Sequence, residues 1–514
     1  MITLISKSYP KIGTSVNTQQ IQMRINHIIA VFTLTLYSLN GQNISDVARW
    51  STTDPTGTAR TLGVGSAFGA MGGDFSVINI NPAGIADFRI SEFTFTPSLR
   101  TSSTESFFQS TSSNISFNKK SSLGLDNIGF VIASNPGTSF TSSNFAIGYS
   151  RISDLQRNVS IGGKTKGSIT TYFAEQANGL TEDELDEFVS FPAFNTGAIF
   201  DFDGDNFYET DFAERDLPVM KAQEITQTGG VNELSLGWAG EYQNKLNMGI
   251  SIGVPFSSFE ESKIYTEDDP DDEIATFRSL EYTERLNTSG VGFNFKAGFT
   301  YKITPAIRFG GAFHSPTWNR FTDNFNTAIV YSFNDGTNQT LSYESLEGTF
   351  QYRITTPWRA IGSVGTIYRI GEIVGFINAD IEHLDYTNAN YNGTAYNNTI
   401  DEQRYTNEVN REVQARLGSA TNVRLGTEMG YKNLRLRVGY SWEQSAFNAD
   451  DFYNNRVSFG AGFRGDRFFI DLGIRLSEQT EGYNPYVVLD ENLDPLTNIN
   501  TNRTRGALTL GFKF

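Results

Sequence analysis

The chain has 514 residues, a formal net charge of −17, and 48 glycine, 41 phenylalanine and 22 tyrosine residues. This acidic balance argues against a nucleic-acid partner, which needs a basic face on the protein. Because the sequence has no cysteine, disulfides, thiolate metal sites and cysteine nucleophiles are excluded. Abundant glycine and aromatic residues suit pleated strands with aromatic girdles better than they suit a helical enzyme.

The one sustained apolar run, Ile28–Leu39, lies near the N-terminus and follows Arg24. A basic residue, about a dozen apolar residues and a small residue such as Gly41 are typical of a secretory signal peptide. The run is too short for a transmembrane helix, which needs about 20 apolar residues. We therefore interpret residues 1–42 as an N-terminal extension and signal peptide that starts at Met23; a structural extension is the alternative.

Residues 43–90 are predicted to form a plug. Within them, Gly57–Phe88 is rich in glycine and small apolar residues and carries almost no charge. Glycine costs backbone entropy and permits positive φ, so such a segment folds only where surrounding protein holds it. Asn81-Pro82 predicts a turn, because proline fixes its own φ and restricts the residue before it.

Residues 91–514 are predicted to form a wall of strands around this plug. Apolar and polar residues alternate there in stretches of about 9–12 residues, the length that a tilted membrane strand needs. A soluble β-sandwich alternates too, so periodicity alone leaves both folds open. In one stretch Met248, Ile250, Ile252 and Val254 share a face, and Asn247, Gly249, Ser251 and Gly253 share the other.

The lengths of the links between strands favour a membrane barrel. Short and long links alternate, as in barrels with tight periplasmic turns and long extracellular loops. The last strand alternates to Phe514 and is predicted to pair with the first, near Glu92–Ser103, because backbone groups in lipid must all be paired. Short links are predicted at 118–122, 154–157, 243–244, 304–305, 369–371, 432–433 and 465–466, and long links at about 167–229, 257–289, 317–349, 387–419 and 479–504.

The order of a signal peptide, a glycine-rich segment with Asn81-Pro82-Ala83-Gly84, and a barrel that ends in Phe514 resembles the FadL/TodX family. The resemblance spans about residues 43–514, and some long relatives carry the label hemin receptor. It implies an all-β transmembrane antiparallel barrel of about 14 strands; about 16 alternating segments can be counted in the sequence. Further matching segments are 167–169, 172–174, 176–179, 313–317 and 355–359.

The resemblance also implies a function. Family members are non-enzymatic channels in the outer membrane of Gram-negative bacteria for long-chain fatty acids or other hydrophobic small molecules. Extracellular loops catch the ligand, a hatch in the lumen releases it, and a kink in the third strand lets it leave sideways into the bilayer. We accordingly expect a monomer with a hydrophobic ligand and outer-membrane lipid as partners, without a nucleic acid or a cofactor.

Two segments are predicted to control passage. Asn81, Pro82, Ala83 and Gly84 are the predicted gating turn, and the alternative is a turn that merely launches the first strand. The third strand is expected at Leu125–Ser134. It ends at Asn135, Pro136 and Gly137, which would break the ladder and form the lateral opening, or else form an ordinary turn.

A third segment is predicted to capture ligand. Thr181 and Glu184 match a capping box, which predicts a helix whose apolar face carries Leu185, Phe188 and Val189. Together with Phe191 these residues would line the outer capture groove, and plain packing of the loop is the alternative.

No metal or haem site is predicted. The acidic run Glu267–Glu273 reads as a solvated loop, and Asp201–Glu209 departs from the calcium-loop pattern. His314 and His383 are the only histidines after the signal peptide and are interpreted as structural or lumenal rather than as haem ligands. A secretion or assembly scaffold and a haem-uptake receptor remain the alternative functions.

Overall fold

The computed structural model describes residues 44–54, 57–108, 114–137, 139–212, 217–334, 336, 339–396, 398–448 and 453–514. The predicted signal peptide and the start at Met23 lie outside these residues. The fold is that of the unit Gln42–Phe514.

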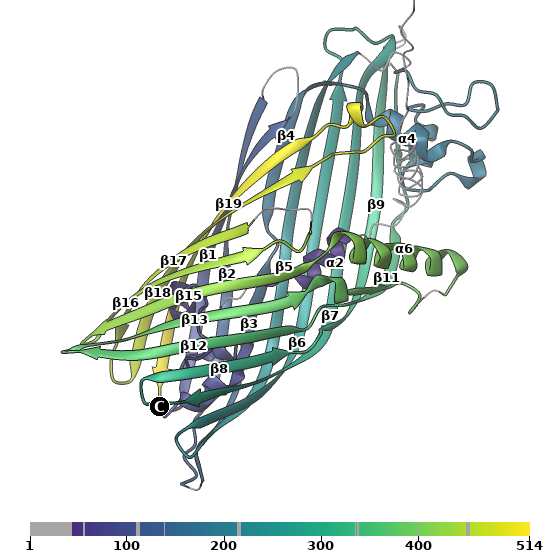
Figure 1. Ribbon diagram of the computed structural model, residues 1–514. Helices are drawn as coiled ribbons and strands as arrows, with labels where there is room; N and C mark the ends of the chain where they lie inside the picture. The colour runs from purple at the N-terminus through teal and green to yellow at the C-terminus, as the bar shows by residue number, and fades with distance from the viewer. Residues whose placement is uncertain are drawn as a thin grey trace, which may run out of the picture. The chain divides into compact units, whose positions relative to one another are not determined.

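One antiparallel sheet makes up most of this unit (Figure 1). Its nineteen strands in the described residues are β1 (Glu92–Phe108), β2 (Asn114–Ile132), β3 (Phe140–Asp154), β4 (Arg157–Lys166), β5 (Pro218–Tyr242), β6 (Leu246–Asp268), β7 (Thr276–Lys302), β8 (Ile307–His314), β9 (Trp318–Asn334), β10 (Thr340–Glu344), β11 (Gly348–Thr355), β12 (Arg359–Ile370), β13 (Ile373–Asp385), β14 (Asn390–Asn392), β15 (Ser419–Tyr431), β16 (Leu434–Gln444), β17 (Tyr453–Arg464), β18 (Phe468–Tyr483) and β19 (Thr497–Lys513).

The helices lie in the N-terminal segment and the loops. They are α2 (Ile44–Ser51), α3 (Ala59–Gly63), α4 (Ile169–Ala177), α5 (Ser190–Asn195) and α6 (Ile400–Arg416), with 3₁₀ helices η1 (Phe75–Asn79), η2 (Pro82–Asp87), η3 (Glu182–Glu184), η4 (Tyr386–Asn388) and η5 (Glu491–Leu493). Within the described ranges, no helix is long and apolar enough to span a membrane.

Several named strands are parts of one longer strand. β3 and β4 pair with the same partner, β5, and are separated only by residues 155–156. In the same way, β8 and β9 are parts of one strand, β10, β11 and β12 are parts of a second, and β13 and β14 are parts of a third. The described chain thus forms a fourteen-stranded barrel, which closes where β19 pairs with β1. The predicted barrel and the predicted pairing of the last strand with the first are confirmed.

Some predicted links are wrong. Residues 118–122 lie inside β2, where they pair with β1. Residues 154–157 interrupt the third strand without reversing it. Both stretches are mostly polar, which led to the prediction of turns. Polar residues also occur where a strand faces water or the lumen, so composition alone does not distinguish the two cases. The long links predicted at 257–289 and 317–349 are mostly strand, because β6, β7 and β9 continue beyond the apolar part of the wall.

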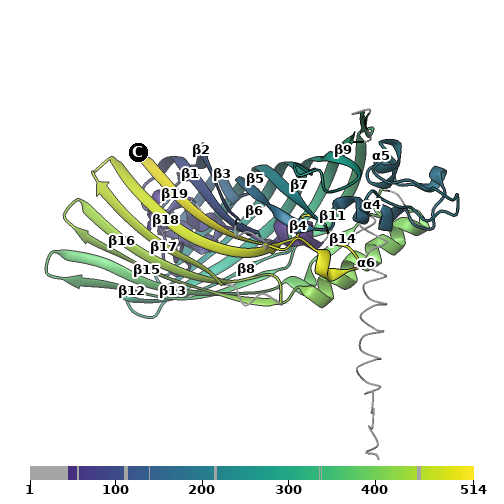
Figure 2. The ribbon, with the colours of Figure 1, turned by 90° about the horizontal axis from the view of Figure 1, so that it is seen from above.

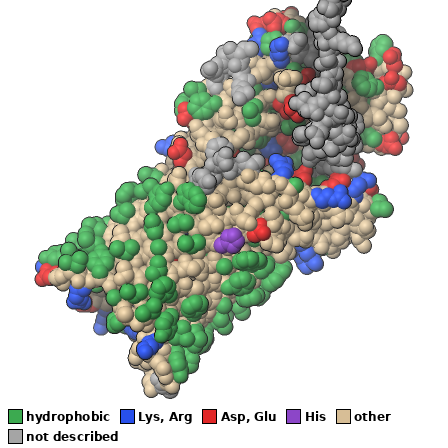
Figure 3. Space-filling model, viewed as in Figure 1, with side chains coloured by type: hydrophobic (Ala, Val, Ile, Leu, Met, Phe, Trp, Pro, Cys, Tyr) green, Lys and Arg blue, Asp and Glu red, His purple; other side chains and the backbone are tan. Residues whose placement is uncertain are grey.

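The apolar face of the wall points outward. Ile250 and Ile252 are 58% and 47% exposed, whereas Asn247 and Ser251 on the opposite face are buried. This is the reverse of a soluble sandwich and is the arrangement of a lipid-facing barrel. Figure 3 shows the resulting band of hydrophobic side chains on the lower part of the visible face.

The band ends at a common level on neighbouring strands. Phe256 of β6 pairs with Val291 of β7, and both are exposed. Beyond this level, Ser258 and Glu260 take the exposed positions on β6. Exposed aromatic residues border the band, with Phe293 and Trp318 near this level and Tyr242, Tyr301 and Tyr431 near the short turns. Two such girdles mark the interfaces of a membrane barrel, so the protein is a membrane-spanning β-barrel.

Candidate functional site

The N-terminal residues 44–54 and 57–88, called the lumenal segment here, pack against the inward face of the wall. Local caps order this glycine-rich chain. The Asp74 carboxylate accepts from Ser76 N at 2.9 Å, from Thr58 Oγ1 at 2.7 Å and from Thr61 Oγ1 at 3.1 Å. One carboxylate therefore joins the start of α3 to the start of η1, which holds a segment with little regular structure in one conformation.

Inward-facing glycines of the wall let the lumenal segment come close. A Cβ on Gly298 of β7 would lie 2.1 Å from Asn81 Oδ1, and one on Gly249 of β6 would lie 2.5 Å from the Pro82 backbone. Such contacts are possible only because glycine has no Cβ. The same close approach occurs at Gly310, Gly426, Gly439 and Gly473, which meet the backbone of Gly69, Val64, Gly65 and Ala59.

The predicted gating residues Asn81, Pro82, Ala83 and Gly84 lie together and are buried. Asn81 caps η2 by accepting from Ala83 N at 3.2 Å. Its Nδ2 donates to Gly69 O at 2.6 Å and to Phe299 O of β7 at 3.0 Å. The turn therefore joins two parts of the lumenal segment to the wall, in addition to leading into β1. Its role in gating stays a prediction.

Ion pairs hold the lumenal segment at several points. Arg60 of α3 makes a two-pronged pair with Glu428 of β15, at 2.8 Å and 2.9 Å. Asp87 of η2 accepts from Arg308 at 2.8 Å and from Lys302 at 3.2 Å. Burial by itself would raise the pKa of the Asp87 carboxyl, but Arg308 and Lys302 lower it below its ordinary value. The charged form is thus the stable form of this contact.

Asp54 makes a third anchor, in the N-terminal part of the segment. Its carboxylate pairs with Arg456 of β17 at 2.9 Å, with Arg505 of β19 at 3.4 Å and with Arg475 of β18. Burial by itself would raise the pKa of the Asp54 carboxyl, but these three guanidinium groups lower it below its ordinary value. No local pattern in the sequence indicates that Asp54 meets these arginines.

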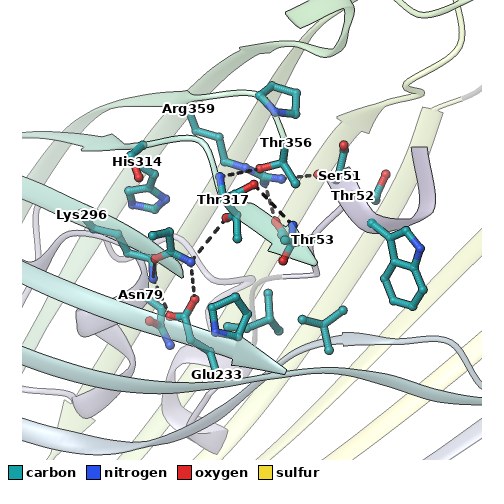
Figure 4. Close-up of a pocket in the computed structure, with 18 of the residues that line it drawn as sticks. Ser51, Thr52, Thr53, Asn79, Glu233, Lys296, His314, Thr317, Thr356 and Arg359 are labelled. Atoms are coloured by element: carbon teal, nitrogen blue, oxygen red, sulfur yellow. Dashed lines mark hydrogen bonds and ion pairs between the residues drawn. The ribbon is translucent and has the colours of Figure 1, made fainter. Parts of the chain in front are cut away.

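A cavity of about 980 Å³, part of it open to solvent, lies between residues 50–53, residues 79–80 and the wall (Figure 4). The Glu233–Lys296 ion pair, with a 2.5 Å contact, and the buried ring of His314 line it together. Arg359 donates to Ser51 O at 2.5 Å and pairs with Thr53 across it. Its apolar lining consists of Trp50, Ile80, Ile152, Val231, Pro255, Phe321, Pro357 and Ile361.

The two histidines differ in environment. His314 Nε2 lies 2.9 Å from Ile80 O, so the ring joins β8 to the lumenal segment. His383 is exposed on the wall, with its ring 6.3 Å from that of Trp358. In the described part of the chain, no group of three or more histidine, aspartate or glutamate side chains could hold a metal ion.

One side of the third strand has an incomplete ladder. β2 pairs with β3 only between Asn127–Ile132 and Phe145–Ser150. In the described residues, no ladder joins residues 114–126 of β2 to β3 or β4, and we call this stretch the seam. At residue 118 the contact across the seam is a side-chain hydrogen bond, in which Asn118 Nδ2 donates to Ser160 Oγ at 2.9 Å. Ile152, which lines the cavity, lies just beyond the last paired residue of β3.

The predicted lateral-opening residues lie elsewhere. Asn135, Pro136 and Gly137 are exposed in the turn between β2 and β3, because Leu125–Ile132 belongs to the second strand and not to the third. The interruption in the third strand is at residues 155–156. The error follows from the turn wrongly expected at 118–122, which shifted the strand count by one.

The predicted capture loop lies between β4 and β5, at the same end as α6 (Figure 2). The capping box of Thr181 and Glu184 is present, but it starts only the three-residue helix η3, and α5 follows later. Leu185 and Val189 are buried in a cluster with strand residues such as Tyr282 and Ile329. The half-buried rings of Phe188 and Phe191 lie 5.4 Å from those of Phe325 and Tyr343, respectively. Packing of the loop is thus present, and capture of ligand stays a prediction.

Comparison with known proteins gives structural similarity without sequence similarity. No family model and no curated protein sequence matches the chain. A Pseudomonas aeruginosa FadL homologue is similar with a TM-score of 0.53 and 12% identity, over 90% of this chain and 100% of that one. The toluene transporter TodX of P. putida is similar with a TM-score of 0.50 and 13% identity, over 90% and 99% of the two chains. The chain therefore has the fold that is shared by TodX and this FadL homologue.

Proposed function

We propose that the protein conducts hydrophobic small molecules, such as long-chain fatty acids, into the outer membrane. The ligand enters between the loops, occupies the cavity beside the lumenal segment and leaves through the seam into the bilayer. The fold it shares with TodX and a FadL homologue supports this class of ligand. The observation that carries the proposal is the position of the cavity next to the seam, because Ile152 lines the cavity and lies on β3 at the edge of the seam.

Sideways exit suits such a ligand. An apolar chain gains about 0.8 kcal/mol for each CH₂ removed from water. A path from the cavity through the seam keeps the chain out of water, whereas a path along the lumen would not. The lumen toward the short turns is also filled by the lumenal segment, whose buried side chains Phe68, Phe75 and Ile78 pack together as one cluster.

The seam can open at low cost compared with other parts of the wall. Opening an intact ladder in lipid would expose unpaired backbone groups, each costing several kcal/mol. At the seam the ladder is already missing, and the Asn118–Ser160 contact is a single side-chain hydrogen bond. We propose that Asn81–Gly84 transmits a shift of the lumenal segment to the wall, and that Leu185, Phe188, Val189 and Phe191 form part of the entrance.

A cross-link across the seam tests this route. Asn118→Cys with Ser160→Cys places two thiols on either side of it, and the chain has no other cysteine. A short bifunctional thiosulfonate reagent should stop uptake of a labelled fatty acid, and a reductant should restore it. The matched control is Thr101→Cys with Ser121→Cys, a paired position between β1 and β2 with side chains 3.0 Å apart, where uptake should not change.

Uptake that continues in the cross-linked Asn118/Ser160 variant would rule out an exit that requires this part of the seam to open. Mass spectrometry of molecules that copurify with the protein checks the ligand class separately. Apolar carboxylates or hydrocarbons would support the proposal. Recovery of haem alone would contradict the proposal and favour haem uptake. His314 could then bind haem only if its ring left its contact with Ile80 O.

A further inference from the structure

The contact between Asp54 and its three arginines has a particular charge balance. Arg456 is shared with Glu443 at 2.9 Å, and Arg505 is shared with Asp126 at 2.7 Å. Asp54 thus brings a third carboxylate to a group of three guanidinium groups, which are each no more than 10% exposed. Moving Asp54 away makes this arginine cluster, Arg456, Arg475 and Arg505, more positive by one charge.

A buried charge that loses its partner is strongly unfavourable, because neither water nor a counter-charge stabilises it. Residues 44–54 can therefore leave the wall readily only if another anion takes the place of the Asp54 carboxylate. The replacing anion must be able to accept hydrogen bonds from guanidinium groups, whatever its shape.

The arginine cluster adjoins the cavity. Asp54 N donates to Ile152 O at 2.8 Å, and Ile152 lines the cavity at the edge of the seam. Ser51, Thr52 and Thr53 form the cavity wall on this side. The short stretch from Ser51 to Asp54 therefore lies between the cavity and the arginine cluster.

We propose that the carboxylate of a ligand replaces Asp54 on Arg456, Arg475 and Arg505, and that this exchange releases residues 44–54 from the cavity. The inference rests on the proposed function and narrows its ligand class to amphiphiles with an anionic head group and an apolar tail. No covalent bond changes; one carboxylate is exchanged for another. The apolar tail lies against Ile152 and Val231 while the head group occupies the arginine cluster.

A label on α2 tests the exchange without relying on transport. Ser45 is exposed, and Ser45→Cys gives the chain its single thiol for a nitroxide. In lipid nanodiscs, decanoate should increase the motion of the label, and 1-decanol, with the same tail and no charge, should do so only at concentrations at least about ten-fold higher. In Asp54→Asn the label should be in motion without ligand, and decanoate should add little.

Asp126→Asn is the matched control. It removes a carboxylate from the same arginine cluster but leaves Asp54 in place, so the label should stay immobile without ligand. Equal responses to decanoate and decanol would overturn the exchange while leaving a hydrophobic-ligand channel intact. An immobile label in Asp54→Asn, or no response to decanoate, would also overturn it. Failure of the proposed function itself would appear separately, as uptake unaffected by the cross-link at the seam.

Discussion

At the scale of single residues, glycines on the inward face decide how the barrel is filled. They occupy the face opposite to the lipid-facing residues, and several touch the backbone of the lumenal segment. A side chain at these positions would displace that segment. The abundance of glycine in the sequence therefore serves close contact between the wall and the lumenal segment.

Gly298→Ala is expected to loosen the lumenal segment without unfolding the barrel. The new Cβ would lie 2.1 Å from Asn81 Oδ1, and overpacking of this kind costs about 1–3 kcal/mol. Cells with the variant should become more sensitive to vancomycin, which is too large for a filled lumen. Gly362→Ala is the control, because its Cβ would point into open space; equal sensitivity of the two variants would contradict the prediction.

Replacing Asn81 and Pro82 by alanine tests the gating turn. The change removes the donors to Gly69 O and Phe299 O, and each buried carbonyl left without its partner costs about 1–3 kcal/mol. The uptake rate should change while the heat-modifiable mobility of the folded barrel on gels is kept. Loss of the folded barrel would instead favour a turn that merely launches β1.

At the scale of elements, the third strand is the irregular part of the wall. Its first part, β3, joins β2 and β5, but its second part, β4, pairs only with β5 in the described ladders. Thr104 of β1 donates to Asn158 O of β4 at 2.6 Å, so β4 crosses the inward face of the wall. Gly229 and Gly230 of β5, with φ of +110° and +156°, lie opposite the interruption and permit the bend.

The anchoring of the lumenal segment should depend on pH. The folded-state pKa values of Asp54 and Asp87 lie below the ordinary carboxyl value of 3.8. Their contribution to docking is therefore complete well above pH 3.8 and is lost as the pH falls below it toward the folded-state values. Ion conductance in planar bilayers should be low at pH 7 and rise below about pH 4.

Asp54→Asn combined with Asp87→Asn gives the matched comparison. This variant should conduct at pH 7 and respond less to acid, because both carboxylates are already gone. Conductance that rises with acid to the same extent in the variant and the unmodified protein would assign the pH response to other groups.

At the scale of the whole molecule, the lipid-facing band fixes how the barrel sits in the membrane. Ile250→Arg places a charge within this band, which costs about 2–4 kcal/mol near the bilayer midplane. Glu260→Arg, beyond the level of Phe256 and Val291, should cost little. Denaturant unfolding in lipid vesicles measures the loss of stability in each variant. Equal losses would mean that Ile250 does not lie deeper in the bilayer than Glu260.

The sequence by itself determined the barrel. Alternation with period two along each strand, the links of unequal length and the final strand to Phe514 are local features, and β19 does close on β1. It also predicted a turn at Asn81–Gly84, where Asn81 caps η2. Where polar stretches such as 118–122 mimic a turn, local pattern failed, because a strand that faces water or the lumen has the composition of a loop.

Only the tertiary structure decided the candidate site. The cavity joins residues from the N-terminal segment to residues of β3, β5–β9, β12, β13 and β15, and the seam depends on which strands pair over which residues. Asp54 and its arginines are about 400 residues or more apart in the sequence, at separations of 402, 421 and 451. Contacts of that range depend on strand order and register around the closed barrel, and no local period encodes them.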